Sequence, residues 1–366
     1  MKKTGIGLIV LAVLGAGCYL FQLIYGAQLT NLHNALPWGL YVVGYMLFTG
    51  IAAGVLLFLG TCWLIERLDA YRPYTGWLTW VGVFGGLIGA GLFIFVDMGS
   101  PQRGIYMMLS PNLTSPQVWD AAILGLYGLT GALLLWQCHE IRAGKRQGIA
   151  KSLAGLAIID GFLVIVTAFV LSLQVAAPLW NHSSVPISFL TSAILAALSV
   201  MVLLFRHPGV IQEAGPVNSL LKPLGLLMAA MLIVELLFVL SDIAIGLYAP
   251  QGEEGKIMVW LMQGKGAPFF WTEMGLLLLA LLGSLFERYR GWGAVLSLLA
   301  VILVKYNLLL AQHLNPLLPT AGPSYASPLV QVVYLPSMLE AGTAAGIVAA
   351  VCLTSYYGMR LLEDRI

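Results

Sequence analysis

Charged residues are scarce in this chain of 366 amino acids. Only 9% of the residues are Asp, Glu, Lys or Arg, whereas 60% are hydrophobic, and the mean hydropathy is +0.90. A soluble domain carries charges on about a quarter of its residues, so the composition excludes that class. The net charge of +2 at pH 7 says little by itself, because the distribution of the charges along the chain matters more than their sum. We expect no nucleic acid among the partners.

Clustered metal ligands are missing as well. The cysteines Cys18, Cys62, Cys138 and Cys352 stand alone, and no Cys-x-x-Cys motif occurs. We therefore expect no iron–sulfur cluster and no other metal site in this chain. All five histidines fall in loops or at the ends of hydrophobic segments. Haem b needs axial ligands on facing helices within the bilayer, so we expect no haem either.

Ten hydrophobic segments fill most of the sequence, each near the roughly 20 residues that cross a bilayer. They are residues 5–26, 39–65, 80–97, 119–138, 153–173, 186–205, 223–247, 268–286, 291–313 and 337–358. We predict an all-α polytopic membrane protein with about ten transmembrane helices. No loop is long enough for a folded soluble domain, so the chemistry must lie within the membrane or at its two surfaces.

Lys and Arg are concentrated in every second loop. Of the 18 basic residues, Arg103, Lys256 and Lys265 flank the segments on one side, and Lys305 lies inside a segment. The other fourteen flank the opposite side. Loops rich in Lys and Arg stay in the cytoplasm. We therefore predict a protein of the bacterial cytoplasmic (inner) membrane with both termini in the cytoplasm.

Polar residues gather at the predicted outer ends of the second, third and fourth segments. Asp97 ends the third segment, Asp120 opens the fourth, and the loop between them carries Arg103. Two interpretations stand for each: Asp120 either caps a helix or acts in chemistry, and Arg103 either neutralises Asp97 or serves a site. Trp38, Tyr41 and Tyr45 recur at spacings of three and four, which places them on one helix face.

Glycines recur every four residues in the second and third segments, as in Gly50/Gly54 and Gly82/Gly86. Such spacing favours close helix packing. The same smooth faces would also suit a groove for an isoprenoid tail.

Several motifs in this sequence resemble the NrfD/PsrC-like membrane subunits of polysulfide-reductase-type respiratory complexes. They run from about residue 30 to 345: Asn34-Ala35-Leu36-Pro37-Trp38-Gly39, Asp97-Met98-Gly99-x-Pro101-x-Arg103, Ser115-Pro116-x-x-Trp119, Pro178-Leu179-Trp180-Asn181 and Tyr334-x-Pro336-Ser337-x-x-Glu340. The resemblance implies two four-helix bundles, residues 39–185 and 186–315. Residues 1–38 and 316–366 then each contribute an outer loop and a flanking helix.

The resemblance also implies a subunit that binds menaquinone or ubiquinone near the outer face and has no redox cofactor of its own. Electrons then pass to a ferredoxin-like iron–sulfur subunit docked there, which serves a molybdopterin catalytic subunit or a multihaem cytochrome c. In some relatives a tyrosine contacts the quinone from the helix before Pro-Leu-Trp-Asn. This chain has Ile165, Val166 and Thr167 there instead.

Our candidate site follows from these patterns. Asp97 and Asp120 are the candidate proton-carrying carboxylates. The candidate quinone-binding residues are His33, Asn34, Trp38, Tyr41, Tyr45, Arg103 and Trp119.

Ionisable residues inside the segments form a second set, because charges in the bilayer are costly and commonly functional. Counted from the inner ends at 1.5 Å per residue, Glu235 lies about 20 Å deep and Lys305 about 22 Å deep. A buried ion pair and a proton relay both fit this match. The relay candidates are Asp160, Glu235, Asp242, Lys305 and Glu340, with Glu273 beside them.

Two alternatives to a quinone-linked subunit are a secondary transporter and a structural anchor with a degenerate site. A transporter would use the intramembrane charges as ligands and would favour helices broken at mid-depth by Gly or Pro. In this chain the prolines lie mostly in loops and at segment ends.

The charge pattern predicts that the loop around Gln147 faces the cytoplasm, while Ser184 and Ser324 face outside. Single cysteines at Gln147 and Ser184, in a background without the four native cysteines, test this orientation. A membrane-impermeant thiol reagent on intact cells should label Ser184→Cys and leave Gln147→Cys unlabelled. The reverse labelling would invert the topology.

Overall fold

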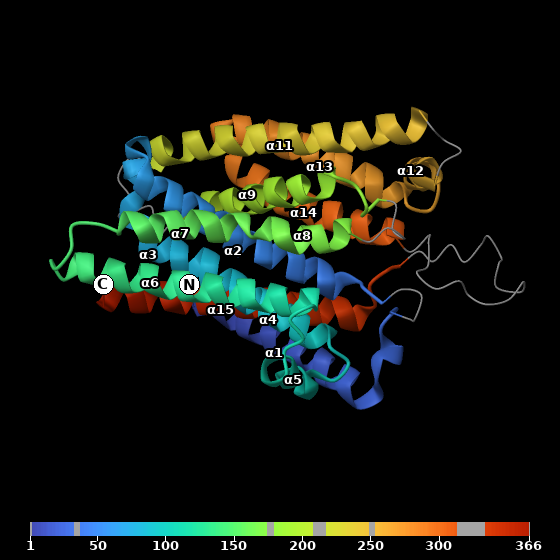
Figure 1. Ribbon diagram of the computed structural model, residues 1–366, viewed down its shortest axis with the longest axis horizontal. Helices are drawn as coiled ribbons and strands as arrows, with labels where there is room; N and C mark the ends of the chain where they lie inside the picture. Colours follow the sequence, from blue (N-terminus) through green and yellow to red (C-terminus); the bar gives the residue numbers. More distant parts are fainter. Residues whose placement is uncertain are drawn as a thin grey trace, which may run out of the picture.

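The computed structural model describes residues 2–32, 37–173, 179–207, 217–248, 253–312 and 334–365, and within them the chain is helical with no strand. Ten helical stretches in this described part are long and apolar enough to cross a membrane. Each overlaps a predicted segment, although the third begins at Glu66 rather than near residue 80, and the fold class is confirmed. The ten lie roughly side by side along the long axis of the molecule (Figure 1).

The helices of the first half are α1 (Lys2–Tyr25), α2 (Leu40–Leu64), α3 (Thr75–Leu78), α4 (Gly85–Asp97), α5 (Ile105–Leu109), α6 (Pro116–Arg142), α7 (Lys151–Phe162) and α8 (Val164–Ser172). The second half holds α9 (Ser184–Phe205), α11 (Val217–Tyr248), α12 (Glu253–Gln263), α13 (Ala267–Leu285), α14 (Arg290–Gln312) and α15 (Met338–Arg365). Short 3₁₀ turns join several of them, including η1 (Ala27–Leu29), η2 (Glu66–Tyr74), η4 (Pro101–Arg103) and η5 (Glu287–Tyr289).

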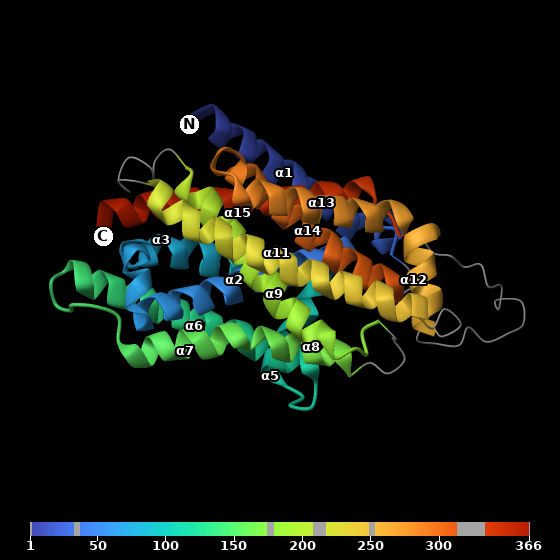
Figure 2. The same ribbon diagram turned by 90° about the horizontal axis from the view of Figure 1, so that it is seen from above.

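Helix α2 lies at the centre of the packing. It contacts α4, α7 and α9 along much of its length, and most of its residues are buried. We call α2 and the helices α4, α6, α7 and α8, which contact it, the first group. Helices α11, α13 and α14 pack together and on α9 as a second group. Helices α1 and α15 run side by side at the edge of the molecule (Figure 2). The exact bundle boundaries of 39–185 and 186–315 stay a prediction.

Glycines allow the central helices to approach closely. A Cβ atom at Gly86 of α4 would lie 2.7 Å from the Phe48 carbonyl oxygen of α2, and one at Gly54 of α2 would lie 2.3 Å from the Ala193 carbonyl oxygen of α9. At Gly82 the space is taken by Val55. Of the two interpretations of these glycines, helix packing is therefore the correct one, and no groove for a tail remains along these faces.

Two membrane-spanning stretches depart from regular α-helix. The third contains a π-helical turn, η3 (Thr79–Phe84), between α3 and α4. The fifth is divided at Leu163, where α7 ends and α8 begins. Neither interruption holds a proline, and π-turns within helices occur frequently beside functional sites. Both interruptions belong to helices that pack on α2.

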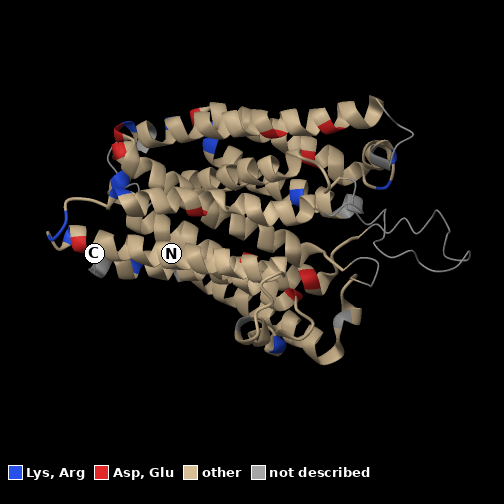
Figure 3. Cartoon of the chain, in the orientation of Figure 1, with Lys and Arg blue, Asp and Glu red and all other residues tan. Residues whose placement is uncertain are grey.

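Basic residues gather at one end of the molecule. The C-terminus and the α6–α7 connection, with its Lys and Arg residues, lie at this end, and the N-terminus lies toward it (Figures 1 and 3). We call this end the basic end. At the opposite end α2 and α6 begin, and Asp97 and Asp120 flank the loop between α4 and α6, so we call it the acidic-loop end. The arrangement agrees with the predicted loop pattern, while the assignment of the basic end to the cytoplasm stays a prediction.

Close packing at Gly86 predicts a stability effect. In Gly86→Ala the new methyl group would press on the Phe48 carbonyl of α2, and overpacking of this kind costs about 1–3 kcal/mol. Gly91 is the matched control, because it lies on the same helix and a Cβ there meets nothing within 4 Å. Thermal unfolding in detergent should show a lower Tm for Gly86→Ala and an unchanged or higher Tm for Gly91→Ala. Equal effects would contradict the packing account.

Candidate functional site

Asp120 is the centre of a polar group at the acidic-loop end. Its Oδ2 accepts a hydrogen bond from the Tyr45 hydroxyl of α2, and its Oδ1 accepts one from the Thr167 Oγ1 of α8 at 2.7 Å. The three side chains come from three helices. Asp120 and Thr167 are half-buried, whereas Tyr45 is only 8% exposed. We call these residues the Asp120 group.

The interpretation of Asp120 as a helix cap is wrong. Helix α6 begins at Pro116, and its cap position is Ser115. Asp120 therefore lies in the second turn, beyond the backbone N–H groups that a cap satisfies. Both of its oxygens bind other helices instead. Asp120 therefore does not cap the start of α6.

Thr167 was missed as a candidate by the sequence reasoning. It is one of the three residues, Ile165, Val166 and Thr167, in the region where the resemblance led us to look for a tyrosine, and the absence of a tyrosine there was the available signal. The short Thr167 side chain reaches only as far as Asp120 in this chain.

Asp97 and Arg103 do not form the pair that one interpretation expected. Asp97 is half-buried at the end of α4, and its Oδ1 finds no hydrogen-bond partner among the described residues. Arg103 is exposed in η4 and makes no ion pair with either Asp97 or Asp120. An arginine therefore does not hold either carboxylate ionised. The neutralising role assigned to Arg103 is wrong.

The three aromatic side chains Trp38, Tyr41 and Tyr45 contact different parts of the protein. Trp38 precedes α2 and stacks on Trp180 at a ring distance of 5.3 Å, so it does not share a helix face with the tyrosines. The Tyr41 hydroxyl donates to Gln22 of α1 at 2.8 Å, which leaves only Tyr45 at the Asp120 group. Trp119 is 53% exposed and donates to the Leu113 carbonyl.

Two further quinone candidates, His33 and Asn34, lie outside the described residues.

Helix α6 carries a polar stripe from the Asp120 group toward the basic end of the molecule. Tyr127 and Thr130 follow Asp120 at helical spacings of seven and ten residues. The Thr130 Oγ1 donates to Asp160 of α7 at 2.5 Å, and both side chains are buried. The buried Tyr127 hydroxyl finds no hydrogen-bond partner among the described residues. Tyr127 was also missed from the sequence, although its spacing from Asp120 gave the signal.

Glu340 is part of a capping box at the start of α15. Its backbone N–H donates to Ser337 Oγ at 3.2 Å, and its Oε2 accepts from the Ser337 N–H at 2.8 Å. The Asn31 N–H and the Tyr334 hydroxyl also bind this carboxylate. Burial, aided by Glu340, raises the pKa of the Tyr334 phenol, which keeps it a donor. Both oxygens of Glu340 thus have structural partners, and its place in a proton relay stays a prediction.

Glu235 and Lys305 do not form the buried ion pair that their depths suggested. The Glu235 Oε1 accepts from Ser188 Oγ at 3.0 Å, and its Oε2 has no partner among the described residues. The Lys305 Nζ lies 3.5 Å from the centre of the Phe189 ring, a cation–π contact, and has no hydrogen-bond partner there either. The sequence gives the depth of each residue along its helix. Whether two side chains meet also depends on the direction in which each one points around its helix axis.

A cavity of about 100 Å³ lies in the second group of helices, away from the Asp120 group. Its polar lining comprises Ser184, Ser188, Glu235, Asp242, Glu273 and Asn307. Asn307 Nδ2 donates to Glu273 Oε2 at 2.5 Å, while Asn307 Oδ1 has no partner among the described residues. A smaller space lined by His182 and Asp242 adjoins it. The volume and the unpartnered oxygens suit several water molecules.

Metal chemistry has no ligand cluster in the described part of the chain, where no group of three or more His, Cys, Asp or Glu side chains is placed to hold an ion.

Residues 28–315 match the family model described as polysulphide reductase, NrfD. The chain belongs to this family. The resemblance drawn from the motifs is thereby confirmed, and it covers both groups of helices.

Three relatives are similar over large parts of the chain. A selenate reductase subunit of Mesobacillus selenatarsenatis is 23% identical, covering 94% of this chain and 89% of the relative. A putative dimethyl sulfoxide reductase membrane subunit of Halobacterium salinarum is 29% identical over 61% of this chain and 56% of the relative. An Hdr-like menaquinol oxidoreductase integral membrane subunit of Archaeoglobus fulgidus is 26% identical over 72% and 65%.

These similarities and the ten apolar helices make the chain a multi-pass membrane subunit of a respiratory oxidoreductase complex.

Proposed function

We propose that this subunit exchanges electrons between membrane quinol and a partner subunit, with the quinol ring bound at the Asp120 group. The observation that carries the proposal is the Asp120 carboxylate, held by Tyr45 and Thr167 about 6 Å along α6 from its first residue. This depth lies near a membrane surface, where a ring on a lipid-soluble tail and water both have access.

The polar atoms of the Asp120 group suit a quinol ring, which carries two hydroxyl oxygens. A carboxylate offers about four acceptor sites, and Tyr45 and Thr167 occupy two of those on Asp120. The remaining lone pairs accept a proton from a quinol hydroxyl, while the Tyr45 oxygen keeps its own lone pairs for a second contact. Oxidation of quinol supplies two electrons and releases two protons. Asp120 takes the first as a general base, and the unpartnered Asp97 Oδ1 is the acceptor we assign to the second.

Electrons must leave for another chain, because the sequence has no cysteine cluster to store them. We assign them to a ferredoxin-like iron–sulfur subunit at the acidic-loop end, which serves a molybdopterin subunit or a multihaem cytochrome c. The names of the relatives as reductase subunits support such an assembly. The exposed apolar side chains of Ile105, Tyr106 and Leu109 on α5 offer a contact surface beside the site.

The name of the Archaeoglobus fulgidus relative contains menaquinol, which favours menaquinone over ubiquinone here. We place the basic end in the cytoplasm of a bacterial inner membrane, so that the Asp120 group faces outward. Both chain ends lie toward that basic end, as such a topology requires (Figure 1).

The polar cavity of the second group supports an added proton-carrying role. Glu235, Glu273 and Asp242 line it, and the Lys305 ammonium lies next to Phe189, which also lines it. Waters in such a space connect carboxylates that do not touch. In the first group, Asp160 and Tyr127 extend the stripe that starts at Asp120. A secondary transporter has less support, because neither helix interruption lies in the group that holds the cavity.

We predict that removing the Asp120 carboxylate, the proposed general base, lowers turnover. In the purified complex, Asp120→Asn should lower kcat for a menaquinol analogue by about 100-fold or more, the scale of general base catalysis. Tyr45→Phe should lower it by about tenfold, equivalent to one hydrogen bond of about 1.4 kcal/mol.

Glu140→Gln at the basic end is the matched carboxylate control for these variants, since Glu140 pairs with Lys145 at the surface, far from the Asp120 group. Co-elution of the subunits on gel filtration checks assembly. Full turnover in an assembled Asp120→Asn complex would rule out this base. If that variant does not assemble, Tyr45→Phe and Thr167→Val carry the test.

The cavity predicts a separate effect on proton movement. In proteoliposomes, Glu235→Gln and Glu273→Gln should each reduce the protons released per electron pair while quinol oxidation continues. The exposed Glu287, in η5 at the basic end, provides the control Glu287→Gln. A pH-sensitive dye and an electron acceptor measure both quantities in one sample. An unchanged ratio in both cavity variants would remove the relay and leave the carboxylates a packing role.

A further inference from the structure

The polar cavity of the second group continues toward the acidic-loop end. A smaller space of about 20 Å³ adjoins the cavity of about 100 Å³, and Leu179, Asp242 and Met258 line both of them. A space of this size holds about one water molecule. His182 lines the smaller space as well. The two spaces together therefore lead from Glu235 to His182.

His182 lies at the acidic-loop end of the protein. It follows Trp180 by two residues, and Trp180 stacks on Trp38, which precedes α2. Helix α9 begins two residues after His182, at Ser184. The His182 side chain is half-buried, so part of it remains accessible to solvent. The ring thus forms a wall of the smaller space close to one surface of the molecule.

Two hydroxyl groups on α9 connect His182 with Glu235. The Ser184 Oγ lies 2.7 Å from the His182 Nδ1, and Ser184 also lines the cavity. Ser188 lies one turn further along the same helix face, and its Oγ donates to the Glu235 Oε1 at 3.0 Å. A hydroxyl group donates one hydrogen bond while it accepts others, and water in the cavity bridges hydroxyls that do not touch. A chain of polar groups therefore runs along α9 from the carboxylate to the imidazole.

The polar side of α11 extends from Glu235 in the same direction. Asp242 lies two turns beyond Glu235, toward the acidic-loop end, and both residues line the cavity. In the opposite direction, Leu232 and Met228 lie about one and two turns before Glu235, and both are fully buried apolar side chains. Protons on these carboxylates thus have polar neighbours toward His182 and apolar neighbours along α11 toward the basic end.

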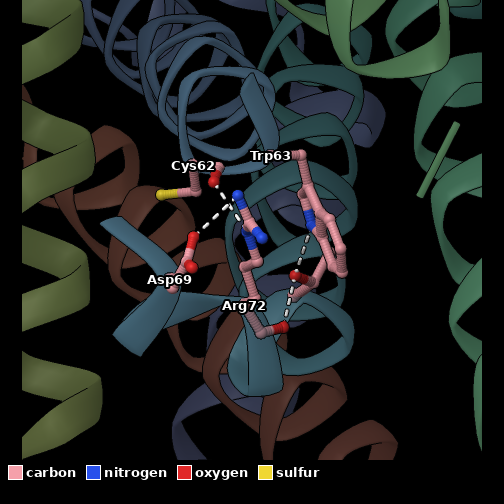
Figure 4. Close-up of polar contacts among 5 residues, drawn as sticks. Cys62, Trp63, Asp69 and Arg72 are labelled. Atoms are coloured by element: carbon pink, nitrogen blue, oxygen red, sulfur yellow. Dashed lines mark hydrogen bonds and ion pairs between the residues drawn. The ribbon is translucent and has the colours of Figure 1, made fainter. Parts of the chain in front are cut away.

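A separate groove of about 520 Å³ opens at the basic end, and none of its lining residues lines the cavity of the second group. Figure 4 shows part of its wall, where the Arg72 Nη2 lies 2.7 Å from the Asp69 Oδ1 and the Arg72 Nε donates to the Cys62 carbonyl oxygen at 3.0 Å. The Trp63 Nε1 donates to the Thr75 Oγ1 at 3.0 Å. These side chains bind one another or the backbone of α2. The groove therefore gives the cavity carboxylates no route to the basic end.

We propose that His182 is the outlet of the cavity and passes protons from its carboxylates to water at the acidic-loop end. This role rests on the proton-carrying function proposed for Glu235 and Glu273. The Ser184 hydroxyl gives its proton to the His182 Nδ1 and takes another from water in the cavity. The imidazolium formed in this way becomes neutral again by giving one proton to outside water. Imidazole suits this exchange, because each ring nitrogen accepts or donates a proton.

Two substitutions of His182 separate proton transfer from packing. Gln and Glu are similar in size, and each accepts a hydrogen bond from Ser184, but only the carboxyl group of Glu gains and loses a proton. Ser184→Ala removes the hydroxyl beside the ring, whereas Ser184→Thr keeps it. His139→Gln is the matched control for the histidine, because His139 is exposed on α6 at the basic end. Ser183→Ala is the control for the serine, because Ser183 is exposed and its side chain makes no capping hydrogen bond.

The test measures protons released per electron pair by the complex in proteoliposomes, with a pH-sensitive dye and an electron acceptor. His182→Gln should lower this ratio as far as Glu235→Gln does, whereas His182→Glu should retain the wild-type ratio. Ser184→Ala should lower it, and Ser184→Thr should retain it. The double variant of His182→Gln with Glu235→Gln should lose no more than either single variant, because both residues act on one path. Both controls should match the wild type.

Four results would overturn the proposal. A wild-type ratio in His182→Gln beside a lowered ratio in Glu235→Gln would remove the outlet and leave the relay. Equal losses in His182→Gln and His182→Glu would reduce the ring to a packing role. Additive losses in the double variant would place the two residues on separate paths. If neither Glu235→Gln nor Glu273→Gln changed the ratio, the proposed relay would fail and the outlet with it.

Gel filtration checks that each variant complex is assembled. If His182→Gln does not assemble, the comparison of Ser184→Ala with Ser184→Thr decides, and equal ratios in these two variants would remove the outlet.

Discussion

The close approach of α2 to its neighbours is the constraint on which the rest of the structure depends. At Gly86 and Gly54 the space for a side chain is taken by the backbones of α2 and α9 respectively. In a bilayer, apolar surfaces gain little from leaving lipid, so such contacts rather than the hydrophobic effect hold helices together. The same contacts fix the height of α2, and with it the position at which Tyr45 meets Asp120 of α6.

Both groups of helices hold buried carboxylates by hydrogen bonds between helices, and both leave some buried polar atoms without a partner among the described residues. The second group differs in that a cavity lies beside these atoms. In the first group, the Asp120 and Asp160 carboxylates each accept a hydrogen bond from a neighbouring helix. In the second, Glu235 and Asn307 keep oxygens without a partner among the described residues, beside a cavity. Buried polar atoms in lipid are costly unless water or protein satisfies them. The first arrangement suits a positioned base, and the second suits a hydrated path.

Much of the fold was readable from the sequence, because a span of apolar residues and the loop charges are local properties. Contacts between side chains of different helices could not be predicted in this way. Thr167 meets Asp120 although they lie on different helices, far apart in the chain, and counting depth along α14 could not give the direction in which Lys305 points. The capping box of Ser337 and Glu340 was a different kind of miss. Its Ser-x-x-Glu pattern was visible, but the expectation of function in an intramembrane acid obscured it.

The central claim is that the quinone ring binds beside Asp120 rather than in the cavity lined by Glu235. Photolabelling of the intact complex with an azido-menaquinone, followed by peptide mapping, tests it most directly. The account predicts labels on the first turns of α2 and α6 and on α8, competed by unlabelled menaquinone. Competed labels confined to α11, α13 and α14 would contradict it.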